Sequence, residues 1–288
     1  MIHRPAGASD ASHRHCAVWA LPPDTSCAAV ARHELRRALR AMNLADEAVA
    51  DATLAVSELV SNAYLHVVAR HGAYWRSDLE LWLYRRGRAE SSQVVCKVFD
   101  ARRDRTRLRP AVPLALNSTE HGRGLGIVEA MVAEWGVHLT RSRLGDGWGV
   151  PGKVVWFAMP APPSPDDLLD GPVTAAQAAY AIQDQLAARG IMRAIRRHDH
   201  DLTTVPVHPR VTVHCGGGAF TWTHDGVRTR VPYTDLVDAG ERLVRLHEEL
   251  SAADDGEAAV AARPGGYEEA ELPGRARRTA ERTGDAGR

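Results

Sequence analysis

The sequence predicts an α/β protein with two folded regions. Three observations support this fold class. A short strand, two long helical patterns and four further strand patterns fill the first half of the chain, a proline-rich stretch follows at 160–172, and a helix, three strands and a helix lie beyond it. The 288 residues are 44% hydrophobic and 25% charged, which is typical of globular domains with a substantial core.

The first region begins with a strand and two helices. A polar, aperiodic arm at 1–15 precedes a short apolar strand at 16–21, which two prolines end. The polar residues Asp24 to Ser26 can cap a helix at 27–42. A break then leads to a second helix at 46–71, whose apolar residues form a broad face. These two helices are expected to pack on a sheet.

Four strands and a third helix complete the first region. An arginine-rich, aperiodic stretch at 101–121 indicates a long loop, and 124–135 has a helical pattern. A polar turn separates the first two strands and a glycine-rich link separates the last two. The strands are predicted at 78–86, 93–100, 137–143 and 153–159.

The sequence of the second region predicts a small αβββα domain. Its first helix is predicted from Thr174 to Arg189, its last helix starts at Thr234, and glycine-rich turns separate the three strands between them. From Ser251 onward large apolar residues are almost absent, which predicts disorder. The expected organisation is a flexible arm at 1–15, a first domain at 16–160, a linker at 161–173, a small domain of unassigned role at 174–250 and a disordered tail at 251–288.

Composition excludes several classes of protein. No run of 18 apolar residues is present, and the N-terminal segment has no apolar core of the kind that secretory signals carry. The four cysteines are scattered without a CxxC pair, which argues for a reducing, cytoplasmic setting. Because 36 basic residues balance 36 acidic ones, neither a nucleic acid nor a membrane surface is an expected partner. Only two of the basic residues are lysines, which we interpret as coding bias.

The second helix carries a row of polar side chains. Glu58, Asn62 and His66 are spaced by four residues, so they share one helical face. An amide oxygen can ligate Mg²⁺, a carboxylate can accept a proton and an imidazole can bind a phosphate. The row therefore suits a metal–phosphate site, although a solvated polar stripe is the plainer alternative.

Two further segments suit a nucleotide. Asp100 ends a strongly apolar strand, where its carboxylate can accept a hydrogen bond from an amine such as that of adenine. The segment 121–126, HGRGLG, leads into a helical pattern, and its glycines let the backbone approach a phosphate at a helix N-terminus. Neither a GxGxxG fingerprint nor a GxxxxGK[ST] loop is present, so the dinucleotide-binding and P-loop classes are excluded.

The order of these segments resembles a known superfamily. ELVSNAYLH, VFD, HGRGLGIVEAMVAEWGV and GKVVWFAM resemble the boxes of the GHKL ATP-binding superfamily, which includes histidine kinases, gyrases and MutL-type ATPases. The chain looks most like the actinobacterial regulatory proteins of the anti-sigma-factor serine-kinase type. The resemblance covers about 16–160. It implies a sandwich in which helices pack on one face of a mixed, mainly antiparallel sheet.

The resemblance also implies a role for each residue. Glu58 matches the general base, Asn62 the Mg²⁺ ligand, and His66 a residue near the phosphates. Asp100 matches the adenine-binding aspartate. The second glycine box would surround the triphosphate of ATP, and it comprises Gly122, Arg123, Gly124, Leu125 and Gly126.

One box departs from the pattern. The family's DxGxG is here Asp100 followed by Ala-Arg-Arg-Asp, without a glycine. The leading interpretation is a cytoplasmic serine/threonine protein kinase that uses ATP and Mg²⁺ and acts on a sigma factor or an anti-anti-sigma-type substrate. The alternatives are an interaction module without turnover, and ATP hydrolysis without a protein acceptor. The oligomeric state stays open, with a homodimer as one option.

The second region offers weaker signals. Its histidines at 198, 200, 208, 214 and 224 could hold a metal, but they lack the spacing of a fixed ligand set. The order of its elements copies that of double-stranded-RNA-binding domains. However, Glu241, Glu248 and Glu249 offset Arg242 and Arg245 on its last helix, so no RNA partner is expected.

Overall fold

The protein contains two antiparallel sheets, each of which carries two helices. The computed structural model describes residues 15–71, 79–103, 128–144, 149–164, 173–191, 197–199 and 202–261. Both sheets lie within one compact unit, which ends at Ala252. Neither α1, α2, α4 nor α5 combines the length and the hydropathy that a membrane crossing requires.

The first sheet has five strands in the order β1-β2-β3-β5-β4, and every pair is antiparallel. The sequence predicted all five strands, with ends that differ by a few residues. Glu134 and Trp135 were expected in a helix but begin β4, since the helical turn at 128–131 ends earlier. The strands are β1 (Ala17–Ala20), β2 (Glu80–Arg86), β3 (Gln93–Asp100), β4 (Glu134–Arg141) and β5 (Pro151–Pro160).

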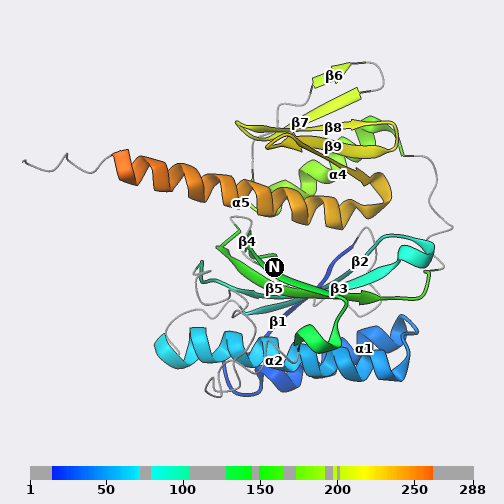
Figure 1. The fold of residues 1–288 in the computed structure, drawn as a ribbon, viewed down its shortest axis with the longest axis vertical. Coiled ribbons are helices and arrows are strands. Elements are labelled where there is room, and N and C mark those ends of the chain that lie inside the picture. The colour runs from blue at the N-terminus through cyan, green and yellow to red at the C-terminus, as the bar shows by residue number, and fades with distance from the viewer. Residues whose placement is uncertain are drawn as a thin grey trace, which may run out of the picture. The chain divides into compact units, whose positions relative to one another are not determined.

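Helices α1 (Cys27–Ala41) and α2 (Asp46–His71) cover one face of this sheet (Figure 1). Their apolar residues are buried against alternate strand residues, among them Val94, Cys96 and Val98 of β3. Because side chains alternate between the faces of a strand, every second residue of β3 points toward these helices. The predicted α+β sandwich is thereby confirmed.

The opposite face of the first sheet is buried as well. In β2 every residue from Glu80 to Arg85 is buried, so both faces of the strand are covered. Tyr84, Val95 and Ala158 pack in one cluster with Val237 of α5. The second region therefore covers the face that α1 and α2 leave open.

The second region consists of α4 (Ala175–Ala187), a five-stranded antiparallel sheet and α5 (Leu236–Ala261). The side chain of Thr174 caps α4 through the backbone amide of Gln177, and Gly190 adopts φ 73° beyond its end. A short 3₁₀ turn, Tyr233–Asp235, precedes α5. The strands follow the order β10-β9-β8-β7-β6 and comprise β6 (Arg197–Asp199), β7 (Leu202–His208), β8 (Val211–Gly216), β9 (Ala219–His224) and β10 (Val227–Pro232).

Two features of this region differ from the prediction. The sheet has two strands more than the predicted three, because Pro206 and the polar residues of β6 obscured the alternation. The last helix does not stop at Leu250, where the tail was expected to begin. It continues to Ala261, since the alanine-rich stretch that follows favours helix.

A buried cluster of charges joins α5 to the first sheet. The Glu241 carboxylate lies 2.9 Å from Nζ of Lys97 and 2.7 Å from Nη2 of Arg143, and it also pairs with Arg189. Glu248 pairs with Arg141 of β4 and with Arg103. Charged contacts therefore cross the proline-rich boundary, although the domain limits themselves stay predictions.

His138 of β4 makes folding sensitive to acid. Its Nδ1 donates to the carbonyl of Leu139 at 2.9 Å, while Nε2 lies 3.3 Å from the Lys97 ammonium. Burial, reinforced by Lys97, lowers the pKa of His138 to about 3. Between pH 6.5 and 3 the unfolded chain therefore binds a proton that the folded one does not, and stability falls as the pH falls.

We expect His138 to make the free energy of unfolding about 2 kcal/mol lower at pH 5 than at pH 7.5. Urea unfolding of the wild type and of His138→Gln across this range measures the effect. His247, whose pKa is also lowered by burial, contributes with the same sign in both proteins, so the difference between them isolates His138. Parallel pH profiles for the two proteins would contradict the assignment.

Candidate active site

Glu58 and Asn62 lie on the flank of α2 that faces away from α1. Leu59 and Val60 form part of the stripe that α2 buries against the sheet. On one side of that stripe, the hydroxyl of Ser57 accepts a hydrogen bond from Arg32 of α1 at 2.8 Å. Asn62 follows Ser57 by five residues, which places it about 140° further around the helix. The predicted polar row thus borders the buried stripe on the side opposite α1.

The side chains of Glu58 and Asn62 are half-buried. Among the described residues, neither the Glu58 carboxylate nor the Asn62 carboxamide has a hydrogen-bond partner. Partly buried polar groups normally form hydrogen bonds with protein or water, because leaving them unsatisfied costs free energy. An acid and an amide one turn apart are thus available to a ligand. An oxygen ligand from Asn62 fits Mg²⁺, which prefers carboxylate, amide, phosphate and water oxygens.

Asp100 ends β3 on the same side of the sheet as the helices. It follows Val94, Cys96 and Val98 in the alternation, so its side chain points toward the face that α1 and α2 cover. Its Oδ1 accepts from Nζ of Lys153 at 2.8 Å and from the backbone amide of Arg102 at 2.9 Å. Among the described residues, Oδ2 has no hydrogen-bond partner. That oxygen is the acceptor that an adenine amine would need.

The electrostatics of Asp100 reflect its burial. The residue is 4% exposed, and burial raises the pKa of its carboxyl group above the ordinary value. The Lys153 ammonium opposes this shift. The pair forms because Asp100 and Lys153 lie directly opposite each other in the register of β3 and β5.

Gly152 allows these two strands to meet at the site. A Cβ atom at this position would lie 2.3 Å from the carbonyl oxygen of Asp100 and 2.6 Å from the ring of Phe99. Such distances are shorter than any van der Waals contact, so a side chain at 152 would displace the end of β3. Gly152 and Lys153 of the GKVVWF stretch therefore position Asp100, a role that the motif alone does not indicate.

The remaining predicted residues are not all described. His66 belongs to α2, but its side chain lies outside the described residues. The glycine segment 122–126, with Arg123 and Leu125, also lies outside them. Arg103, at the start of the arginine-rich stretch, pairs with Glu248 at 3.2 Å. That arginine therefore has a structural partner on α5.

No cluster of three or more histidine, cysteine, aspartate or glutamate side chains in the described part of the chain could hold a metal ion. Of the histidines that suggested a metal, the side chain of His198 and all of His200 lie outside that part. His208 instead packs edge-on against His247, with ring centroids 5.7 Å apart. The amide oxygen of Asn62 on α2 therefore remains the candidate metal ligand in the described part of the chain.

Comparison with known families agrees with this geometry. Residues 21–156 match the family model of the histidine kinase-like ATPase domain. The matched range holds α1, α2, Glu58, Asn62 and Asp100, and it ends within β5. No curated protein matches the chain. Residues 21–156 are therefore similar to a histidine kinase-like ATPase domain, and this match supports a relationship to the GHKL-type ATPase superfamily.

Proposed function

We propose that the protein is an ATP- and Mg²⁺-dependent serine/threonine protein kinase of the anti-sigma-factor type, which regulates transcription in the cytoplasm. The observation that carries the proposal is the pair Glu58 and Asn62 on the flank of α2 that faces away from α1, where neither side chain has a hydrogen-bond partner among the described residues. The match of residues 21–156 to the histidine kinase-like ATPase domain supports it. The expected protein partner is a sigma factor or an anti-anti-sigma-type substrate.

Each residue has a defined part in this reaction. Glu58 takes the proton from the serine hydroxyl of the partner, and the serine oxygen then attacks the γ-phosphorus of ATP as ADP leaves. Asn62 holds Mg²⁺, which neutralises charge on the phosphates when it is bound. Asp100 accepts the adenine amine through Oδ2. Backbone amides of the glycine segment 122–126 stabilise charge on the transferring phosphoryl group.

A nucleotide-binding module that sequesters its partner without turnover is the second candidate. Two observations favour it: the first glycine box lacks its glycines, and a second folded region covers the back of the sheet. Hydrolysis of ATP without a protein acceptor is the third. In the module, Glu58 has no proton to accept.

Incubation of the full chain with γ-labelled ATP, Mg²⁺ and a lysate of the source organism distinguishes the three. A labelled protein band supports the kinase, released phosphate supports the hydrolase, and bound but intact ATP supports the module. A chain that neither binds nor turns over ATP would contradict all three.

Asp100→Asn should weaken ATP binding by about 10- to 100-fold, because a hydrogen bond to a charged acceptor is worth about 1.5–3 kcal/mol. The ion pair with Lys153 adds a complication, since the variant also leaves a buried ammonium without its carboxylate. Calorimetric titration with ATP, at a temperature where the variant is folded, measures the affinity.

Lys153→Met is the matched control for this variant. It breaks the same ion pair but keeps the Asp100 carboxylate, so its ATP affinity should change far less. Unchanged affinity in Asp100→Asn would remove Asp100 from the nucleotide site. Equal losses in both variants would show that the ion pair, rather than a contact with adenine, governs binding.

A further inference from the structure

A cavity lies on the face of the first sheet that α1 and α2 do not cover. It has a volume of about 540 Å³ and is lined by β2 to β5, by β9 and β10, and by α5. This volume falls within the range of small-molecule sites. The proposed nucleotide site uses the opposite face of the same sheet, so the cavity is separate from it.

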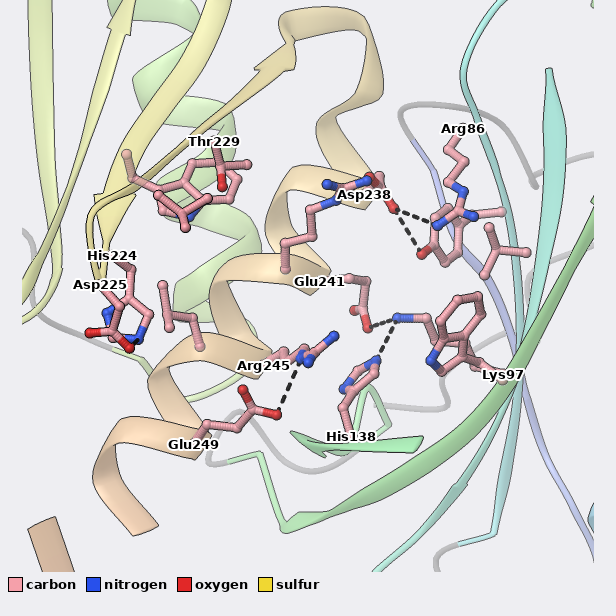
Figure 2. Close-up of a pocket in the computed structure, with 17 residues that line it drawn as sticks. Arg86, Lys97, His138, His224, Asp225, Thr229, Asp238, Glu241, Arg245 and Glu249 are labelled. Atoms are coloured by element: carbon pink, nitrogen blue, oxygen red, sulfur yellow. Dashed lines mark hydrogen bonds and ion pairs between the residues drawn. The ribbon is translucent and has the colours of Figure 1, made fainter. Parts of the chain in front are cut away.

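The floor of the cavity holds a buried ammonium group with hydrogen-bonding capacity to spare. Lys97 is 3% exposed, and Figure 2 shows its Nζ between Glu241 and His138. These contacts measure 2.9 and 3.3 Å and are its only hydrogen bonds among the described residues. An ammonium has three protons to donate. One therefore remains for a ligand.

Beside the cavity floor, several cations share a single carboxylate. Lys97 shares the Glu241 carboxylate with Arg143 and Arg189, so three cations surround one anion. Two further carboxylates that line the cavity are paired with arginines, Asp238 with Arg242 and Glu249 with Arg245. The Asp225 side chain lies 3.2 Å from His224 and is 86% exposed.

Two arginines at the mouth add donors. Arg242 and Arg245 lie one turn apart on α5, and each side chain is 48% exposed. Each uses its Nε for its own ion pair, and the terminal guanidinium nitrogens have no hydrogen-bond partner among the described residues. Guanidinium groups bind carboxylate and phosphate oxygens in a planar, two-point geometry.

The walls offer flat apolar surface. Trp156 of β5 and Trp222 of β9 both line the cavity, one from each sheet. Large aromatic rings favour stacked or edge-on contacts with flat ligands. Hydrogen-bond donors therefore remain available in the cavity, while its buried carboxylates are paired. The flat surface of Trp156 is shared with the Arg86 guanidinium, which lies 5.5 Å from the ring centroid.

We propose that this cavity is a second ligand site, which binds a small anion with a flat, apolar body. The acidic group lies between Lys97 and the two arginines, and the flat body contacts the indole rings. The site goes beyond the proposed kinase function and does not depend on it, because it lies on the other face of the sheet.

Titration of the full chain with 2-naphthoate and with 2-naphthamide tests the proposal. The two probes share a ring system, but only the first is an anion. Isothermal calorimetry and tryptophan fluorescence should show naphthoate binding at least tenfold more tightly than the amide. ATP should not displace it. Equal affinities, no binding, or competition with ATP would overturn the proposal.

A pair of double variants locates the bound anion. Arg242→Gln with Arg245→Gln should reduce naphthoate affinity about tenfold or more and leave naphthamide and ATP binding unchanged. Arg228→Gln with Arg230→Gln removes the same charge from exposed positions of β10 that do not line the cavity, and should have little effect. Equal losses in the two would show a general effect of charge and would contradict this site. Thermal unfolding confirms that both variants are folded.

Discussion

Glu58→Ala should reduce phosphoryl transfer to the protein acceptor by about 10²- to 10⁴-fold while ATP still binds, because general-base catalysis contributes factors of this size. The carboxylate has no structural partner among the described residues, so its removal should leave the fold intact. On the proposed geometry it faces the nucleophile rather than the phosphates. Initial rates of acceptor labelling and calorimetric ATP affinities, measured on the same preparations, test both halves of this expectation.

Two further variants make the result specific. Asn62→Ala removes the proposed metal ligand, so it should lower Mg²⁺-dependent ATP binding, which Glu58→Ala should not. Glu47→Ala removes an exposed carboxylate from the first turn of the same helix and should change neither quantity. Equal transfer by wild type and Glu58→Ala would exclude the kinase mechanism. Inactivity of both, together with tight partner binding, would favour the non-catalytic module.

The elements with strong periodicity could be predicted from the sequence. Helix α2 begins at Asp46 and ends at His71, and β3 runs from Gln93 to Asp100, as their patterns indicated. Each has a long, regular apolar pattern with polar residues at its ends. β6 and β7 were not predicted, since short strands interrupted by proline and charged residues have little periodicity. Glu134 and Trp135 were predicted as helix from their local pattern, but they pair with β5 as part of β4.

The structural role of the two lysines was not predicted from the sequence. Both lie in apolar strands, Lys97 in β3 and Lys153 in β5, and both are buried beside a carboxylate. The two lysines of this arginine-rich chain therefore mark two buried ion pairs. Coding bias accounts for the arginines but not for these positions.

The sequence predicted the candidate residues of the site but not the residues that position them. Family motifs identified Glu58, Asn62 and Asp100, and the alternation of β3 placed Asp100 on the helix-covered face. The roles of Gly152 and Lys153 depend on the register between β3 and β5, which pairs residues 53 positions apart along the chain. Local patterns contain no information about such pairing. For the same reason, the contact between Lys97 and Glu241 could not be predicted from the sequence.

Glu241→Gln should lower the free energy of unfolding by about 3–5 kcal/mol, the usual cost of removing one partner from a buried ion pair. Burial alone would raise the pKa of Glu241, but Arg189, Lys97 and Arg143 outweigh it and hold the pKa well below its ordinary value. The carboxylate therefore stabilises the fold above about pH 4.5, and this contribution is lost as the pH falls through its lowered pKa. Replacing it leaves three cations together at a site where Glu241 is 2% exposed.

Glu249→Gln provides the matched control on the same helix. Its pair with Arg245 is a partly exposed i,i+4 contact of 3.2 Å, so its loss should cost no more than about 0.2–1 kcal/mol. Urea unfolding at pH 7.5 compares the two variants with the wild type. A lower midpoint with an unchanged slope in Glu241→Gln alone means that the cluster stabilises the whole compact unit. Losses of similar size in both variants would contradict this, because the buried cluster would then contribute no more than a surface ion pair.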